Sequence, residues 1–290
     1  MITMDVNQFN EKYLALHEDT KKAIKELEDL TGKKVVFRLI KREEAQTFFK
    51  LKIKLARKIM DNHVIIINED NVDNKNELNY YIVHEAVHGL RLFKGDESYR
   101  KVLKVHSDKI EELNNKLLSE ILPKLNASGL NINQFKDYCA YLANNIFQLF
   151  ANASVDARIE IYISKHYPGL AKMQKQAQKK YAKEILESFD KNKTYLIPDW
   201  ILTRVNAVNY AYLTKITPII GKSWISKANS NMSKDFKCLI DKLMVDLETL
   251  DNGQVTDIET LNSWAKILEV EDYIFLDDFE NIDIFYILSN

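Results

Sequence analysis

The chain has 290 residues, which is enough to bury a large core and is long for one compact domain. Its 41 basic and 42 acidic residues leave a formal charge of -1, so net charge attracts neither nucleic acid nor an anionic membrane. Only 7 Gly and 4 Pro accompany 46% hydrophobic residues, a composition typical of a helix-rich globular protein without low-complexity linkers. The sequence shows no secretion signal and no uncharged apolar run that could span a bilayer, so we expect a cytoplasmic protein that binds neither membrane nor nucleic acid.

Before residue 70 the hydrophobic pattern changes from helical to strand-like. Segment 8–30 places apolar residues at helical spacing and is a predicted helix. Segments 34–40 and 63–68 are rich in β-branched residues and are predicted strands. The segment 49–55 is ambiguous, because its apolar residues alternate with lysines as in a half-buried strand but also fit a helix over 48–59. We favour the strand.

The segment 75–93 is predicted to form a buried helix, because apolar residues occur on nearly all of its faces. It contains the sequence H-E-x-x-H, in which His84 and His88 are one helical turn apart. Two imidazoles at this spacing, with Cβ atoms about 5–6 Å apart, can reach one metal ion. Glu85 projects beside them, where it can act as a general base but not as a ligand. Because burying these three ionisable groups is costly without a partner, we favour a metal site over packed core residues.

A helix that carries His84, Glu85 and His88 in this pattern resembles the zincin superfamily of zinc metallopeptidases and is gluzincin-like. The resemblance extends over about residues 33–166 and is specific in the five-residue motif. It implies that the histidines bind Zn²⁺, that the metal lowers the pKa of its water to about 7, and that Glu85 takes the proton as the water attacks a peptide carbonyl. The order of strands before the helix also matches zincins, whose sheet edge borders the cleft and can pair with an extended substrate.

After Gly95 the pattern is almost entirely helical. We predict a helix over 97–122 and a long helix or a kinked pair over 133–166, with a helical hairpin inserted at about 97–130. Further helices are predicted over 170–190, 199–216, 233–250 and 256–269. The acidic and aromatic end, 271–290, is expected to pack against the body, although such a segment can also bind a partner or block its own site.

A catalytic zinc site usually has three protein ligands, so one of the later helices should supply the third. Within 133–166, Asn152, Asp156 and Glu160 recur every four residues and therefore share one helical face. The pattern N-x-S-x-D-x-x-I-E resembles a downstream helix motif in some H-E-x-x-H proteins, and it implies Asp156 as the ligand and Glu160 as a carboxylate that orients a zinc-bound histidine. The swapped assignment remains open, as does a solvated face on which both acids pair with Arg158 or nearby lysines.

Other candidates have less support from the sequence. Glu97 and His106 are the next residues to consider for the third ligand if neither acid lies near the histidines. Zincins commonly use a Tyr, His or Arg from the later part of the chain to stabilise the oxyanion, and Arg204, Tyr210 and Tyr212 are candidates by residue type alone.

The sequence therefore predicts an α+β protein that is predominantly helical. We expect a zincin-like core, with a small N-terminal sheet packed on the H-E-x-x-H helix and an inserted helical hairpin, over 1–168, and a helical C-terminal lobe over 169–290. The predicted function is a zinc metallopeptidase that acts on peptide or protein substrates. The alternative is a non-catalytic protein that keeps the zincin scaffold as an interaction or regulatory module, but only catalysis needs a carboxylate at Glu85. A DNA-binding regulator finds no support in a basic helix or an excess of positive charge.

Overall fold

The computed structural model describes residues 2–41, 51–58, 60–71, 75–128, 132–189, 197–224 and 234–281. The strands are β1 (Ile2–Asp5), β2 (Lys34–Ile40), β3 (Leu51–Lys54), β4 (Asn62–Asn68), β5 (Lys101–Val105) and β6 (Ile274–Asp278). The helices are α1 (Val6–Lys12), α2 (Glu18–Thr31), α3 (Lys75–Lys94), α4 (Ser107–Ser128), α5 (Ile132–His166), α6 (Ala171–Ser188), α7 (Asp199–Lys215), α8 (Thr217–Ile220), α10 (Lys234–Glu248) and α11 (Gln254–Ile267). The fold is mostly helical with a small mixed sheet, as predicted. Among the helices described, none has the length and apolarity needed to cross a bilayer.

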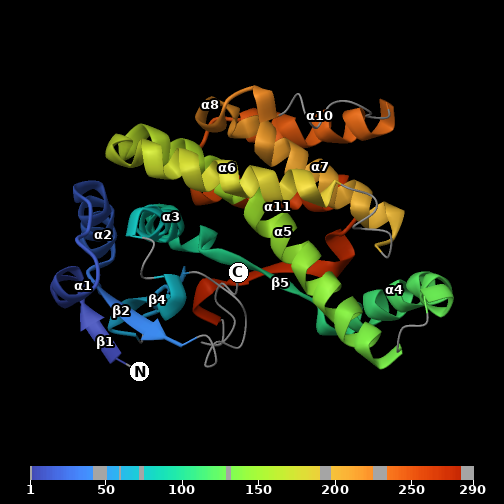
Figure 1. The fold of residues 1–290 in the computed structure, drawn as a ribbon, viewed down its shortest axis with the longest axis horizontal. Coiled ribbons are helices and arrows are strands. Elements are labelled where there is room, and N and C mark those ends of the chain that lie inside the picture. Colours follow the sequence, from blue (N-terminus) through green and yellow to red (C-terminus); the bar gives the residue numbers. More distant parts are fainter. Residues whose placement is uncertain are drawn as a thin grey trace.

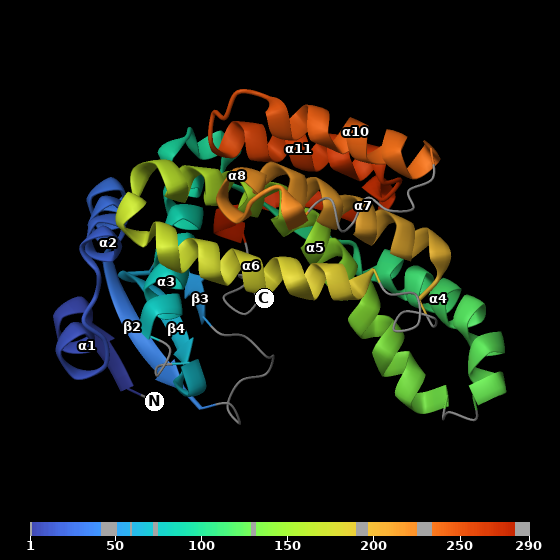
Figure 2. The ribbon, with the colours of Figure 1, turned by 45° about the horizontal axis from the view of Figure 1, so that its top comes forward.

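A four-stranded mixed sheet lies at one end of the molecule, and α4 with the start of α5 lies at the other (Figures 1 and 2). The strand order is β1-β2-β4-β3, in which β2 and β4 are parallel and the outer strands are antiparallel to their neighbours. Phe37, Ile53 and Ile65 point to the same face and pack with residues of α2 and α3 in one core. This face of the sheet therefore supports α3, which carries the H-E-x-x-H motif.

The predicted strands over 34–40 and 63–68 are confirmed by β2 and β4. The ambiguous segment is a strand over Leu51–Lys54, where β3 pairs with β4. Residue 55 follows the strand, and residues 49 and 50 lie outside the described ranges. The helix predicted over 75–93 is α3, which ends one residue later than expected. β2, β4 and α3 have a clear local hydrophobic pattern, so the sequence alone was enough to place them.

The prediction of a single helix over 8–30 is wrong, because the helix is interrupted between the end of α1 and the start of α2. At the break, Asn10 Oδ1 accepts a hydrogen bond of 2.7 Å from the Leu16 N–H, and Asn79 Oδ1 on α3 accepts one of 2.8 Å from the His17 N–H. The His17 side chain then caps the start of α2. These bonds replace helical ones, and the apolar spacing gives no sign of them.

The first part of the helix predicted over 97–122 is also wrong, because β5 occupies it and pairs antiparallel with β6. An ion pair of 2.7 Å between Lys104 Nζ and Asp277 Oδ2 joins the two strands. Before β5 the chain forms only a short 3₁₀ turn, Glu97–Tyr99, and the α-helix begins at α4, which continues through Pro123 and packs against α5. The insertion predicted as a helical hairpin over 97–130 is therefore, over its described residues 97–128, a short 3₁₀ turn and a strand followed by one α-helix.

Helix α5 is continuous rather than a kinked pair, and it joins two hydrophobic cores. Ile159 and Ile163 in its C-terminal half belong to the core of the sheet, α2 and α3. Phe147 and Phe150 belong to a second core, which α7, α10 and α11 also line. The helices predicted after residue 170 are found as α6, α7, α10 and α11, and the chain then returns to the first core through Phe279.

Candidate metal centre

The partly exposed residues of α3 form a stripe on an otherwise buried helix. Tyr81, His84, Glu85 and His88 are half-buried, whereas every other residue over 78–92 is buried. Side chains at these positions project from the same side of a helix. The accessible face of this part of α3 is therefore the face that carries the H-E-x-x-H motif.

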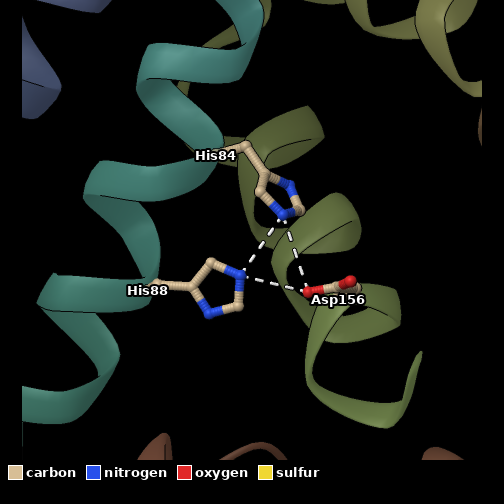
Figure 3. A group of neighbouring side chains, drawn as sticks. All are labelled: His84, His88 and Asp156. Atoms are coloured by element: carbon tan, nitrogen blue, oxygen red, sulfur yellow. Dashed lines mark hydrogen bonds and ion pairs between the residues drawn. The ribbon is translucent and has the colours of Figure 1, made fainter. Parts of the chain in front are cut away.

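Helix α5 brings Asp156 to this face, opposite the two histidines (Figure 3). Asp156 Oδ1 lies 3.1 Å from His88 Nε2 and 3.5 Å from His84 Nε2, and the two Nε2 atoms are 3.3 Å apart. The three atoms form a nearly regular triangle. The side chains are 14 to 22% exposed, so the triangle lies at the edge of the interior.

The triangle has the dimensions and the chemistry of a metal site. Tetrahedral zinc with ligand bonds of about 2.0–2.2 Å separates its ligand atoms by roughly 3.3–3.6 Å. Asp156 Oδ1 is buried and accepts no hydrogen bond from a donor of the described chain. Burial alone would lower the pKa of His84, but the neighbouring carboxylates of Asp156 and Glu160 raise it well above its usual value. The site therefore favours a positive charge, and its three donor atoms can hold a cation.

Glu160 lies one turn beyond Asp156 and contacts the other side of the His84 ring. Its Oε1 is 2.9 Å from His84 Nδ1 and accepts a hydrogen bond of 2.5 Å from the Tyr80 hydroxyl. Its Oε2 accepts one of 2.8 Å from Gln174 Nε2. The Glu160 side chain is fully buried and points away from the triangle, so it supports His84 and does not take part in the donor set.

A chain of hydrogen bonds through α6 and α7 determines which groups donate to Glu160 and which accept. The Tyr212 hydroxyl donates to Gln178 Oε1 at 2.7 Å, and Gln178 Nε2 donates to the Tyr80 hydroxyl at 2.6 Å. Tyr80 must then donate to Glu160, whose carboxylate is an acceptor for all its neighbours. We therefore assign the proton of neutral His84 to Nδ1, which leaves the lone pair of Nε2 facing Asp156 and His88.

Glu85 lies beside the triangle, on the side of the sheet edge. Its Oε2 accepts a hydrogen bond of 3.2 Å from the Ile53 N–H in β3. Burial raises the pKa of Glu85, and the neighbouring histidines His88 and His84 oppose this rise. A carboxylate with a raised pKa next to a metal site is suited to accept a proton and to release it again.

The structure also places the weaker candidates. Glu97 contacts Lys58 and Arg100, and the exposed His106 ring lies against Phe275, so neither joins the triangle. Arg204 binds the Leu268 carbonyl and Glu269 instead of facing the site. Tyr210 is buried, and Tyr212 belongs to the hydrogen-bond chain behind Glu160. Arg158 donates to the Asp246 carbonyl and to Thr260, and not to Asp156 or Glu160. Asn152 is half-buried and lies one turn before Asp156 on α5.

Sequence reasoning did not identify Tyr80, Gln174, Gln178 or Tyr181. Gln174 and Gln178 are buried polar residues on the same face of the lysine-rich α6 as the buried Ala177, and this spacing is a signal that a helical plot would reveal. Tyr181 lies within electrostatic reach of Asp156, its ring centroid is 5.5 Å from that of Tyr212, and it is 38% exposed.

Comparison of the chain with models of protein families, with curated proteins and with solved structures finds no match. The functional assignment is therefore based on the motif and on the arrangement of the side chains around it.

Proposed function

We propose that this protein is a zinc-dependent peptidase in which His84, His88 and Asp156 hold the metal and Glu85 is the general base. The observation that carries the proposal is the triangle of two imidazole nitrogens and one carboxylate oxygen, with edges of 3.1 to 3.5 Å, beside a motif glutamate. Two nitrogens and one oxygen suit zinc, and three protein ligands leave a coordination position open. Glu160 has a supporting role in this proposal because it binds the Nδ1 side of His84.

Zinc bound at this site supplies a Lewis acid that polarises a carbonyl and lowers the pKa of water to about 7. Glu85 accepts a proton from water as the water oxygen attacks the carbonyl carbon of a peptide bond. The same carboxyl then delivers this proton to the amide nitrogen as the C–N bond breaks, so that one water molecule is added overall. The hydrogen bond from the Ile53 N–H holds the Glu85 carboxylate between the sheet edge and the histidines.

The test is metal content combined with cleavage by the purified full chain. We expect about one Zn²⁺ per chain and cleavage of an unstructured protein or of a mixed peptide library, detected by mass spectrometry. Glu85→Gln should retain zinc and lose activity, whereas His84→Ala or His88→Ala should lose both. Failure of the purified protein to contain or take up zinc would contradict the proposal.

A zinc-loaded protein that cuts no peptide would instead favour the interaction module that keeps the scaffold. Loss of zinc from the Glu85→Gln variant would also count against the assigned roles, because Glu85 would then be part of the metal site rather than the base.

A further inference from the structure

Two of the three edges of the metal triangle depend on how two helices are spaced. His84 and His88 both belong to α3, so that helix alone sets the 3.3 Å between their Nε2 atoms. Asp156 belongs to α5, so its distances of 3.5 and 3.1 Å to these atoms depend on where α5 lies relative to α3. A metal site requires its ligand distances to be correct within about 0.2 Å. The spacing of α3 and α5 must therefore be well defined.

Glu160 attaches α5 to α3 on one side of the triangle. It accepts a hydrogen bond from the Tyr80 hydroxyl and lies 2.9 Å from His84 Nδ1, so it binds the part of α3 that leads into the motif. One polar attachment leaves the helices free to pivot about it, and apolar packing is non-directional. A second polar attachment beyond His88 would fix the distance from Asp156 to both histidines.

Helix α11 provides this second attachment, because two of its buried residues bind one arginine from each ligand-bearing helix. Asp257 accepts hydrogen bonds of 2.6 and 2.8 Å from Arg91 of α3. Thr260 accepts one of 2.8 Å from Arg158 of α5. Asp257 and Thr260 are buried, and residues three apart are neighbours on the surface of a helix. One face of α11 therefore binds both helices.

Asp257 also separates two like charges. Its Oδ1 is 2.6 Å from Arg91 Nη2 and 3.9 Å from Arg158 Nη1. Both arginine side chains are buried, so solvent ions screen their mutual repulsion poorly. Burial lowers the pKa of Arg158, the charge of Asp257 raises it, and the charge of Arg91 lowers it further. Removal of the Asp257 charge would therefore drive α3 and α5 apart at this point.

The two arginines lie close to the metal ligands along their helices. Arg91 follows His88 by three residues and Arg158 follows Asp156 by two, so they are displaced by roughly 4.5 and 3 Å along the helix axes. A hydrogen-bonded helix is stiff over so short a stretch. A shift of either arginine therefore moves the neighbouring ligand with it.

We propose that Asp257 and Thr260 are positioning residues of the metal centre, which hold α3 and α5 at the spacing that brings Asp156 to the two histidines. The inference rests on the metal site of the proposed function and does not depend on peptide cleavage. It makes α11 a support of the site, although none of its residues belongs to the triangle.

The test is the zinc affinity of the folded protein, measured by competition with a chromophoric chelator. Asp257→Asn should weaken zinc binding about tenfold, the lower end of the range for residues that act on a metal through its ligands. Asp251→Asn is the matched control, because it removes a carboxylate from the same arginine at a position that is 37% exposed. The control should change the affinity less than about twofold.

Two further measurements separate positioning from stability. Thr260→Val leaves no buried carboxylate or guanidinium without a partner, so we expect it to fold even if Asp257→Asn does not. It should weaken zinc binding roughly two- to fivefold, since a neutral acceptor contributes less than a charged one. The visible absorption of bound Co²⁺ reports ligand geometry, so it should change in both α11 variants and keep its native form in Asp251→Asn.

The outcomes distinguish this inference from the proposed function. Native zinc affinity in folded Asp257→Asn, or in Thr260→Val if the first variant does not fold, would overturn the positioning role and leave the proposed function intact. Equal losses in Asp257→Asn and Asp251→Asn would also overturn it, because the effect would then come from Arg91 alone. If the native chain binds no zinc, the proposed function fails and the positioning role fails with it.

Discussion

Asp156 and Glu160 lie one turn apart on α5, and their lengths and surroundings suit them to different tasks. The shorter Asp156 side chain places Oδ1 within 3.5 Å of both histidine Nε2 atoms. The longer Glu160 side chain passes behind His84 to Nδ1 and is fully buried among hydrogen-bond donors. A metal ligand needs an oxygen that faces the ion, and a positioning residue needs an oxygen that fixes the imidazole from the opposite side.

The two acids should therefore differ in their effect on zinc binding. Asp156→Ala should weaken zinc binding severely because it removes one of three ligands. Glu160→Ala should weaken zinc affinity or activity only about 10- to 100-fold, the usual scale for a residue that orients a ligand. Competition with a chromophoric chelator gives both affinities, and thermal unfolding of each apo-variant checks that it is folded. Equal losses, or a larger loss for Glu160→Ala, would favour the swapped assignment.

His63 on β4 is a buried histidine that belongs to the fold and not to the site. Its Nδ1 accepts a hydrogen bond of 2.9 Å from the Ala56 N–H, and its Nε2 is 2.9 Å from Thr31 Oγ1. The Thr31 hydroxyl donates to the Leu27 carbonyl, so Nε2 must carry a proton and the ring is neutral. Burial, with a smaller effect of the Lys33 charge, lowers the pKa of His63 to about 4.

This lowered pKa predicts acid destabilisation in a definite window. The unfolded chain takes up a proton at His63 near pH 6.5 and the native protein only near pH 4, so the unfolded state binds more protons between these values. The contribution of neutral His63 is present above pH 6.5 and is lost as the pH falls toward 4, by up to about 3 kcal/mol. Urea unfolding from pH 7 to pH 4 should show this slope, and His63→Gln should reduce it. His106→Gln, at an exposed position, is the matched control and should leave the slope unchanged.

Helices and strands that are determined by their own local sequence pattern could be predicted from the sequence. The apolar pattern of 75–93 and the β-branched run of 34–40 place α3 and β2 to within a residue. β5 could not be predicted, because Val102 and Val105 fit a helix and the strand depends on pairing with β6 near the other end of the chain. Local propensity is overridden when a distant partner supplies the hydrogen bonds.

The residues of the candidate site also fall into those that a local pattern predicts and those that depend on how distant elements pack. Asp156 and Glu160 stand out as polar residues at helical spacing on an apolar helix, so their proximity to the motif could be predicted. Tyr80, Gln174 and Gln178 could not be assigned, because their function depends on how α6 packs against α3 and α5. The helical spacing of Gln174 and Gln178 marks two polar residues on the buried face of α6, but it does not show which groups they contact.

The segment after β6 is held by one aromatic anchor. Phe279 is 1% exposed, its ring meets that of Phe93 at 5.7 Å, and its N–H donates to the Arg100 carbonyl at 2.7 Å. Phe275, four residues earlier, is 37% exposed and lies over His106. The expected packing of the C-terminal segment against the body is thus confirmed as far as residue 281, and 282–290 lie outside the described residues.

Truncation of the two phenylalanines should have unequal effects. Phe279→Ala should lower the free energy of unfolding by about 3–5 kcal/mol, because it leaves a cavity in the core that supports α3. Phe275→Ala removes a similar ring from a partly exposed position and should cost less than about 1 kcal/mol. Urea unfolding of both variants makes the comparison. A small effect of Phe279→Ala would mean that this segment is not anchored in the core.

Arg91 joins the motif helix to the C-terminal part of the chain. It lies on α3 three residues after His88, is 5% exposed, and donates to both oxygens of Asp257 at 2.6 and 2.8 Å. Nη1 and Nη2 each donate to Asp251 at 2.8 Å, so Nη2 contacts both carboxylates. Asp257 is 1% exposed, and the only other guanidinium near it within the described ranges is that of Arg158, at 3.9 Å. The position of α3 thus depends on Asp257 in α11 and on Asp251 in the turn before it, as well as on the sheet.

The different burial of Asp257 and Asp251 predicts that the Arg91–Asp257 pair contributes more to stability than the Arg91–Asp251 pair. Arg91→Ala leaves the buried carboxylate of Asp257 without its main partner and should cost about 3–5 kcal/mol, the usual loss when a buried ion pair is broken on one side. Asp251→Ala removes a carboxylate that is 37% exposed and should cost only about 1 kcal/mol, because solvent screens this pair. Arg91→Lys should recover little, since an ammonium group cannot donate to two carboxylates in this fork geometry. Equal costs for Arg91→Ala and Asp251→Ala in urea unfolding would show that the buried Arg91–Asp257 pair does not hold the two parts of the chain together.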